Sequence, residues 1–391
     1  MVEWKTLNDI CSKITDGSHF SPQSVEVGFY MPSVKDMTSK GFDYTSCKKI
    51  SEEDYNSLIK SGCKPKRNDV LVAKDGSMLK YVFPISKEEN IVVLSSIAIL
   101  TPKTDLIDSR YLSFYLLRSD VKEQTIREFS SKGGVPRIIL KNFKKIRIPI
   151  PSLSEQQRIV EQLDTFTSSI ENLKEQIAQR RKQYECYRDQ LLDLEGKEGV
   201  EMKTLGEICE FVRGPFGGAL KKDIFVKDGY AIYEQQHAIY GSWSFRYYVD
   251  EKKFLEMKRF EVKSGDILMS CSGTMGKTSI VPPNCVKGII NQALLKLTAK
   301  ECINNYFLKF FMDSQWFQDG LKKQTAGGAI QNVASVSVLK ELIVPVPSLS
   351  EQQRIVSILD TFESSINNLE QQLAQREKQY EYYRNKLLTF E

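Results

Sequence analysis

The decapeptide PSLSEQQRIV at residues 151–160 is the most informative stretch for the fold, because it returns letter for letter at residues 347–356. The likeness then continues to the end of each half of the chain. A shorter likeness opens each half, with VEWKTL at residues 2–7 and VEMKTL at residues 200–205. Internal repeats of this kind indicate one structural plan used twice. The chain is therefore predicted to consist of two similar halves that begin and end alike.

The repeated segment has apolar residues at alternating steps of four and three, which is the spacing of a coiled-coil seam. Arg180 and Arg376 interrupt the seam at equivalent places. An ordinary amphipathic core helix is the alternative, but two unrelated core helices would have no reason to share polar residues such as Glu155 and Lys182. The residues expected to pair the helices are Ile159, Leu163, Phe166, Ile170, Leu173 and Ile177 in the first copy and Ile355, Leu359, Phe362, Ile366, Leu369 and Leu373 in the second.

Capping boxes are expected where these helices begin, at Ser154-x-x-Gln157 and Ser350-x-x-Gln353, and Gly196 is expected to stop the first helix. A helix of about 38 residues spans roughly 57 Å at about 1.5 Å per residue, which suits a spacer. The ends of a compact domain lie close together, so the segment between the helices predicts that they run antiparallel. The two globular segments would then lie at opposite ends of a rod, related by a pseudo-twofold axis.

The segments outside the helices predict mixed α/β domains of short strands and helices with turns between them. Matching strands are expected at residues 69–73 and 266–270, and matching buried helices at residues 111–117 and 306–312. Most loop residues differ between the halves, as two domains with one scaffold and two specificities would require. The predicted domains are residues 1–150 and 196–346, and the predicted helices are residues 151–195 and 347–391.

The composition of the chain sets outer limits on its class. Its 391 residues are 41% hydrophobic and 27% charged, and no apolar run approaches the roughly 20 residues of a membrane-spanning helix, so we expect a cytoplasmic protein. A formal charge of +5 permits a polyanionic partner without requiring one. The eight cysteines are scattered without a C-x-x-C pair, which predicts reduced and mostly buried thiols. With only two histidines, a metal site is not expected.

Three stretches resemble a known family. They are IPIPSLSEQQRIV at residues 148–160 with its copy at 344–356, GDIL at 265–268 followed by GTMGK at 273–277, and DGSHFSP at 16–22. Together with the order domain, helix, domain, helix, they resemble the specificity subunit of type I restriction-modification systems over essentially the whole chain. The first half departs from the pattern at Leu79, where the second half has Gly276.

The resemblance implies that each domain binds one half of an asymmetric, interrupted target in double-stranded DNA, while the helices set the gap. It also implies that the helices dock two methyltransferase subunits, which methylate adenine N6 with S-adenosylmethionine. Restriction subunits can join these to make an ATP-dependent nuclease. The chain itself would then need no cofactor. Self-association through the helices stays open, as do the target bases and the spacer length.

The sequence lacks the common catalytic signatures. GKT at residues 276–278 looks like part of a phosphate-binding loop, but Cys271 stands where that loop needs a glycine. PPN at residues 282–284 has the wrong order for the Asn/Asp-Pro-Pro-aromatic motif of amino-methyltransferases. No glycine-rich fingerprint follows an early strand. We therefore expect a non-catalytic reader of DNA.

Candidate DNA contacts follow from side-chain chemistry. Glutamine can pair bidentately with adenine in the major groove, while lysine, arginine and hydroxyl groups suit phosphates. The base-reading candidates are Gln235, Gln236 and His237, whose alternative role is to end a strand. The phosphate candidates of the second domain are Ser272, Thr274, Lys277, Lys322 and Lys323. The candidates of the first domain are His19, Lys74, Ser77, Lys80, Lys132 and Arg137, although a single loop lysine is often only solvated.

Two other classes of function stay open. One is a self-contained DNA-modifying enzyme with a duplicated recognition unit, which activity of the isolated chain with S-adenosylmethionine or Mg²⁺ would reveal. The other is a coiled-coil adaptor that binds only proteins, which would not alter the bases protected by its complex.

Overall fold

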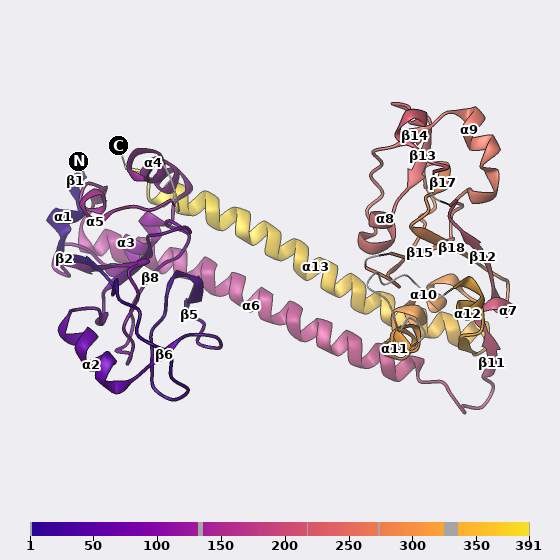
Figure 1. Cartoon of the computed structure of the whole chain (residues 1–391), viewed down its shortest axis with the longest axis horizontal. Coiled ribbons are helices and arrows are strands. Elements are labelled where there is room, and N and C mark those ends of the chain that lie inside the picture. Colours follow the sequence, from indigo (N-terminus) through magenta and orange to yellow (C-terminus); the bar gives the residue numbers. More distant parts are fainter. Residues whose placement is uncertain (1, 132–135, 217, 273, 324–334, 391) are drawn as a thin grey trace. The chain divides into compact units, whose positions relative to one another are not determined.

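The computed structural model describes residues 2–131, 136–216, 218–272, 274–323 and 335–390. The chain divides into two compact units: unit 1 contains residues 1–174 and 372–391, and unit 2 contains residues 175–371. Each unit combines one mixed α/β domain with one end of each of two long helices, α6 (Leu153–Leu192) and α13 (Leu349–Leu387) (Figure 1). The predicted fold class, two similar mixed domains with two long helices, is confirmed.

Unit 1 is built on a four-stranded antiparallel sheet in the order β2-β9-β7-β8. The strand β7 (VLVA) is buried along its whole length, as expected of an apolar run in a central strand. A separate ribbon pairs β1 with β10, which leads into α6. The strands are β1 (Glu3–Thr6), β2 (Cys11–Asp16), β3 (Phe29–Tyr30), β4 (Met37–Thr38), β5 (Gly41–Phe42), β6 (Lys49–Ile50), β7 (Val70–Ala73), β8 (Val82–Pro84), β9 (Ile97–Pro102) and β10 (Arg147–Ile150). The helices are α1 (Leu7–Ile10), α2 (Glu52–Lys60), α3 (Ser109–Leu116), α4 (Ser119–Phe129) and α5 (Leu140–Phe143), with a 3-10 turn at Val34–Asp36.

Unit 2 repeats this scaffold with the sheet β12-β18-β15-β16 and the ribbon β11-β19. The remainder differs: a three-stranded sheet β14-β13-β17 stands where unit 1 has the short ribbons β3-β6 and β4-β5. The strands are β11 (Glu201–Thr204), β12 (Cys209–Arg213), β13 (Tyr230–Tyr233), β14 (Tyr248–Val249), β15 (Ile267–Ser270), β16 (Thr278–Ile280), β17 (Gly288–Ile290), β18 (Leu294–Ala299) and β19 (Ile343–Val346). The helices are α7 (Leu205–Ile208), α8 (Gln235–Tyr240), α9 (Glu251–Glu256), α10 (Asn305–Asp313), α11 (Gln315–Lys323) and α12 (Val336–Lys340), with 3-10 turns at Lys222–Ile224 and Lys258–Phe260.

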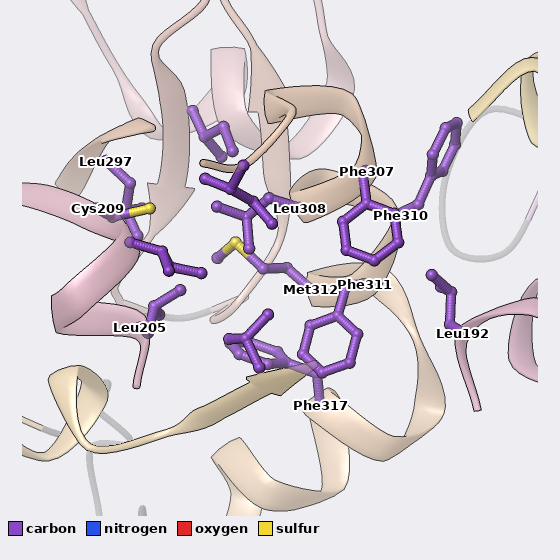
Figure 2. Close-up of a cluster of buried hydrophobic side chains, with 14 of the residues drawn as sticks. Leu192, Leu205, Cys209, Leu297, Phe307, Leu308, Phe310, Phe311, Met312 and Phe317 are labelled. Atoms are coloured by element: carbon purple, nitrogen blue, oxygen red, sulfur yellow. The ribbon is translucent and has the colours of Figure 1, made fainter. Parts of the chain in front are cut away.

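Each globular core receives side chains from the first turns of one long helix. Ile159 and Leu163 of α6 are fully buried in the core of unit 1. Ile355 and Leu359 of α13 take the equivalent places in unit 2. The first turns of both helices therefore belong to the domains as much as to the helix pair. Figure 2 shows the unit 2 core, to which α10 contributes Phe307, Leu308, Phe310, Phe311 and Met312.

One buried glutamine fastens each helix to its domain. The side chain of Gln156 is fully buried, and its Oε1 accepts a hydrogen bond from the Asp108 amide at 2.8 Å. Its Nε2 donates to the carbonyl oxygens of Pro151 and Leu106 at 2.9 and 3.0 Å. Gln352 is buried equally and makes the equivalent three bonds in unit 2, at 2.7 to 3.2 Å. The repeated decapeptide therefore contains the residue that joins helix to domain.

The capping boxes predicted at Ser154 and Ser350 are wrong by two residues. In α6 the cap is Ser152, whose Oγ accepts a hydrogen bond from the Glu155 amide at 3.3 Å, and α13 begins in the same way. Ser154 already lies in the first helical turn, because the helix starts directly after the cap. The Glu155 carboxylate does not complete a box but pairs with Arg158 at 2.5 Å.

In unit 1 the start of α6 contacts the end of α13. The rings of Phe166 and Tyr383 stack with centroids 5.2 Å apart, and the guanidinium of Arg376 lies 5.8 Å from the Phe166 centroid. About two turns further along α6, Lys174 forms an ion pair of 2.9 Å with Glu377. Later residues of α6 therefore contact earlier residues of α13, so the two helices run antiparallel here.

Unit 2 repeats these contacts with the helices exchanged. The rings of Phe362 and Tyr187 stack at 5.3 Å, Arg180 lies 5.9 Å from the Phe362 centroid, and Arg181 pairs with Glu370 at 2.5 Å. The antiparallel pairing predicted from the sequence is confirmed. The arginines thought to interrupt the seam instead cover the phenylalanine rings of the other helix. Among the other residues expected to pair the helices, Ile170 and Ile177 are buried, and Leu173, Ile366, Leu369 and Leu373 are half-buried.

All eight cysteines are free thiols, of which Cys11, Cys47, Cys63, Cys209 and Cys271 are buried and Cys186 is exposed. Burial raises the pKa of the Cys209 thiol to about 12, so this group stays protonated at neutral pH. In the described parts of the chain, every helix is too short or too polar to cross a membrane.

Candidate nucleic-acid interface

The loop after β7 in unit 1 is bonded to residues 136–138, and Lys74 at its start pairs with Asp16 at the end of β2. The Gly76 amide donates to the Pro136 carbonyl at 2.8 Å, and the Ile138 amide donates to the Lys74 carbonyl at 3.1 Å. These bonds place the exposed side chain of Arg137 beside the loop. The exposed ring of His19 lies 3.4 Å from the Asp16 carboxylate, at the end of β2. The fold therefore brings together three segments that are separate in the sequence and that side-chain chemistry had singled out one by one.

Lys74 lies at the centre of this region but faces inward. Its side chain is buried, and its ammonium lies 3.2 Å from Asp16 and 3.5 Å from Asp75. Two carboxylates balance the charge of this ammonium, and burial leaves it little surface to offer a DNA phosphate. The prediction that Lys74 contacts DNA is therefore corrected: Lys74 holds the loop to β2.

The two loops differ by one residue. The Leu79 amide donates to the Ala73 carbonyl at 2.9 Å, and the Gly276 amide makes the equivalent bond to Ser270. The next bond runs from the Ala73 amide to the Tyr81 carbonyl in unit 1 and from the Ser270 amide to the Lys277 carbonyl in unit 2. Tyr81 comes two residues after Leu79, whereas Lys277 directly follows Gly276, so Lys80 is an extra residue in the loop of unit 1. Lys80 is therefore not the counterpart of Lys277, although the two sequences suggest that it is.

The turn itself is the same in both units, although one has leucine and the other glycine. Leu79 has a φ of +53° and Gly276 a φ of +73°, both in the left-handed region. Leu79 is buried in the unit 1 core, which offsets the cost of that conformation. In unit 2 a Cβ on Gly276 would lie 2.6 Å from Leu321 Cδ2, so Leu321 occupies the space instead.

In unit 2 the side chain of Gln235 ties α8 to the loop after β15. Its Nε2 donates to the carbonyl of Ser272, and its Oε1 accepts from the Ser272 hydroxyl at 3.3 Å. Thr274 and Lys277 are exposed on the same loop, and the Ser270 hydroxyl donates to the Thr274 carbonyl at 2.6 Å. Gln235 and Ser272 therefore support the loop, while Thr274 and Lys277 point their groups to solvent.

His237 is not available to a DNA base. The residue is fully buried, and its ring stacks on Phe245 with centroids 4.7 Å apart. The Glu234 amide donates a hydrogen bond to its Nδ1 at 2.8 Å, and its Nε2 lies 3.0 Å from the Ser244 carbonyl oxygen. The prediction of a base contact is corrected: sequence alone could not tell a buried capping histidine from an exposed one. Gln236 beside it is half-buried.

The remaining candidates lie in the loop after β7 and in the last turn of α11. Ser77 is half-buried and Lys80 is exposed, with its ammonium 5.2 Å from the Tyr81 ring. Lys322 and Lys323 are exposed at the end of α11, where Lys322 lies 3.6 Å from Asp319. Lys132 and Gly273 lie outside the described residues.

Two exposed phenylalanines were missed by reasoning from the sequence. Phe20 is 67% exposed and Phe216 is 92% exposed, each in the loop that follows the first strand of the four-stranded sheet. Both loops turn at a glycine pressed on a neighbouring backbone: a Cβ would lie 1.9 Å from a carbonyl oxygen at Gly17 and 1.8 Å from one at Gly214. The Ser18 hydroxyl holds the Phe20 backbone with bonds of 2.6 and 3.1 Å. The shared glycine followed by an aromatic residue was the available signal.

The two units have equivalent sheets with unlike loops, and each unit contains part of both long helices. These features define a class of duplicated-domain proteins, in which one scaffold presents two different surfaces. Within the described segments, no group of three or more His, Cys, Asp or Glu side chains could hold a metal ion.

The family model described as "Type I restriction modification DNA specificity domain" matches residues 1–180 and 197–377. The chain therefore belongs to the family of type I restriction-modification DNA specificity subunits and contains two copies of the family's domain. It is 30% identical to the specificity subunit of the type I restriction enzyme EcoR124I/EcoR124II of Escherichia coli, over 66% of this chain and 67% of that one. It is 27% identical to a putative type I specificity subunit of Haemophilus influenzae, over 100% and 96% of the two chains.

Solved structures share this fold. The type I restriction-modification S subunit from M. genitalium aligns over 100% of this chain and 97% of its own, with 16% identity and a TM-score of 0.58. A chain from a study of complex assembly and conformational transition in the type I system aligns over 99% and 97%, with 16% identity and a TM-score of 0.66.

Proposed function

We propose that this chain is the DNA-reading subunit of a type I restriction-modification complex, in which each unit binds one half of an interrupted target. The single observation that supports this most is the contrast within the molecule: the sheets β2-β9-β7-β8 and β12-β18-β15-β16 are equivalent, while the loops that leave them are not. One scaffold fixes the position of each reader, and different loops recognise different bases.

The exposed cations and hydroxyls of the loops are proposed to contact phosphates. In unit 1 these are Lys80 and Arg137, and in unit 2 Thr274 and Lys277. The R137A and K277A substitutions should each weaken DNA binding by the assembled complex and lower the slope of log K against log salt by about 1. K378A, at an exposed position on α13, is the matched control and should leave the slope unchanged.

The exposed rings of Phe20 and Phe216 are proposed to make apolar contacts with the duplex. Because such a contact releases no counterions, F20A and F216A should weaken binding without changing the salt slope. A changed slope in these variants would show that they had disturbed the neighbouring cations instead.

The chemistry is proposed to belong to partner subunits. Two methyltransferase subunits would dock on the long helices and supply S-adenosylmethionine for adenine N6 methylation, and restriction subunits would bring ATP and Mg²⁺. The chain itself would have no catalytic site. Its role is to place the duplex so that a docked subunit can turn an adenine out of the stack.

The helix pair is proposed to set the gap between half-sites. Deleting residues 170–176 and 366–372 together removes one heptad from each helix and leaves Arg181 opposite Glu377, so the charge pairing survives. The tolerated spacer between half-sites should change, while each half-site sequence stays the same.

The test is methylome sequencing of host DNA with the wild-type gene, with the deletion variant and without the gene. Loss of N6-methyladenine from one two-part motif on gene removal supports the proposal and supplies the target. An unchanged methylome in cells that contain the assembled complex would contradict it, and an unchanged spacer in the deletion variant would contradict the role of the helices.

A further inference from the structure

Unit 1 contains a buried arginine where α3 meets α4. The guanidinium of Arg118 donates from Nη1 to the Leu388 carbonyl, just after α13, and from Nη2 to the Thr389 hydroxyl at 3.2 Å. Asp120 accepts from its Nε and Nη2 at 3.0 and 2.6 Å. The guanidinium also lies 5.6 Å from the centroid of the Tyr115 ring. Unit 1 therefore fills the space between α3 and the end of α13 with its own arginine.

Unit 2 has a serine at the equivalent place and leaves the space open. Ser314 occupies the position of Arg118, since the amide of each donates to the carbonyl three residues earlier, at 3.1 and 3.2 Å. A hollow of about 460 Å³ lies there, which we call the Ser314 hollow. Figure 2 shows two of its lining side chains, Phe311 of α10 and Leu192 at the end of α6. Asp193, Met202, Trp316 and Pro345 also line it.

Groups that hold Arg118 in unit 1 have counterparts in the hollow. Phe311 takes the place of Tyr115, and its buried ring packs against that of Trp316 with centroids 5.4 Å apart. Asp193 takes the place of Thr389 and replaces a hydroxyl by an exposed carboxylate. Trp316, which is 53% exposed, replaces Asp120. The space thus keeps an aromatic wall and an acidic group but lacks the cation, so its chemistry fits a guanidinium brought from outside.

We propose that the Ser314 hollow receives an arginine side chain presented by a protein partner. An arginine fits better than a lysine, because a planar guanidinium can lie on the exposed Trp316 ring and donate to Asp193 at once. The exposed Trp316 and the apolar Leu192 suit a partner in which apolar residues flank that arginine. The identity of the partner rests on the proposed function: it is a modification subunit docked at this end of α6.

The binding chemistry is tested on the full chain with N-acetyl-arginine amide as probe, by calorimetry or saturation-transfer NMR. Wild type should bind with a dissociation constant of about 1 mM, as expected of one side chain, and N-acetyl-lysine amide at least about fivefold more weakly. S314R should fill the hollow and weaken binding about tenfold or more. S314A is the matched control, because it removes the hydroxyl that accepts from the Phe317 amide at 3.3 Å without filling the space.

Two further variants keep the proposal open to refutation if S314R fails to fold. D193N removes the carboxylate and should weaken probe binding roughly fivefold. R118S opens the equivalent space in unit 1 and should add a second probe site. Unchanged binding in S314R or D193N, equal binding of the lysine probe, or absence of arginine binding would overturn the proposal.

Cys186 reports on the partner directly, since it is exposed and lines the hollow. Its alkylation by a maleimide, followed by mass mapping, should slow severalfold when purified modification subunits assemble on the wild-type chain. The S314R chain should assemble more weakly than S314A. Full reactivity of Cys186 in a formed complex would overturn the proposal while leaving the DNA-reading function intact. Failure of the wild-type chain to form any such complex would instead contradict the proposed function, and the probe result would stand by itself.

Discussion

The two ends of the helix pair share one aromatic contact but have opposite charges at equivalent positions of the repeat. Phe166 on Tyr383 in unit 1 is matched by Phe362 on Tyr187 in unit 2. In the ion pairs beside these rings, α6 supplies both cations, Lys174 and Arg181, and α13 supplies both anions, Glu377 and Glu370. Repeat positions 174 and 370 therefore have opposite signs, as have positions 181 and 377. The apolar seam fixes the geometry of pairing, and the charges distinguish α6 from α13.

Near-identical helices are therefore not interchangeable in this protein. Two copies of α6 in the same register would place Lys174 against Arg181, and two copies of α13 would place Glu370 against Glu377. Like charges that face each other would disfavour both wrong pairs, whereas the observed pair of α6 with α13 places opposite charges together. Paired substitutions in the two units test which features the ends share, and their expected effects decrease from the buried glutamines to the exposed charges.

The buried glutamines should show the greatest loss of stability and the same loss in both units. Replacing Gln156 or Gln352 by leucine leaves one buried amide and two carbonyls without partners and should cost about 3 kcal/mol of local stability. Native-state hydrogen exchange should find the loss in unit 1 for Q156L and in unit 2 for Q352L. The neighbouring exposed residue provides the control Q157L, which should change little. Unequal losses would show that the helix-to-domain joints are not equivalent.

The aromatic contacts should rank second. F166A and F362A each remove a half-buried ring together with its stacking partner and its arginine contact, which should cost about 2 kcal/mol. Denaturant unfolding with fluorescence and hydrogen exchange should give similar losses for the two. A loss in one variant only would mean that the stacked geometry matters at one end of the pair alone.

The ion network of unit 2 should respond to alkaline pH. Burial lowers the pKa of Lys309, but the carboxylates of Asp313 and Glu363, each 3.2 Å away, outweigh burial and hold that pKa above its usual value. A cation with a raised folded pKa stabilises fully below its unfolded pKa of 10.5 and loses that contribution as the pH rises through the folded value.

The K309M variant should therefore be less stable than wild type at pH 8, with the difference shrinking above about pH 10.5. Thermal unfolding against pH measures this. Unit 1 provides the contrast, because the position equivalent to Lys309 is Ser113, whose hydroxyl donates to the Ser109 carbonyl at 2.8 Å. A constant difference between K309M and wild type across this range would contradict the titration of Lys309.

The charge pairs between the helices should give the least change in stability. The K174E and R181E substitutions together place glutamate against Glu377 and Glu370 and should cost roughly 1 kcal/mol or less, since all four side chains are more than a third exposed. Adding E370K and E377K should restore stability, and the loss should fade in high salt. A salt-independent loss, or no rescue by the reversed pair, would rule out the charges as the distinguishing element.

Much of the architecture could be predicted from the sequence for physical reasons. The strands at residues 69–73 and 266–270 were visible because apolar runs of that length bury both faces in a central strand. The long helices were visible because the heptad spacing is a local property of the chain. The cap of α6 was misplaced because Ser152 and Ser154 are chemically alike, and only the backbone decides which of them precedes the helix.

The candidate site was predicted less well, because its residues depend on burial and long-range contacts. Lys74 and His237 have the right chemistry for DNA but are turned inward, one toward Asp16 and the other onto Phe245. Phe20 and Phe216 have the chemistry of core residues but stand exposed. Whether a side chain faces inward or outward in a loop is set by segments distant in the sequence, so residue type alone does not reveal it.

The order of residues was enough to establish two copies of one plan, two long helices with an apolar seam, and unlike loops on a shared scaffold, because repetition and periodicity can be read along the chain. Which groups are free to bind depended on tertiary packing. The folded chain paired Arg376 with Phe166, joined Gln156 to the domain, filled one space with Arg118 and left its counterpart beside Ser314 open. These outcomes depend on which side chains meet across the fold, and distances between remote residues are fixed by packing rather than by their order along the chain.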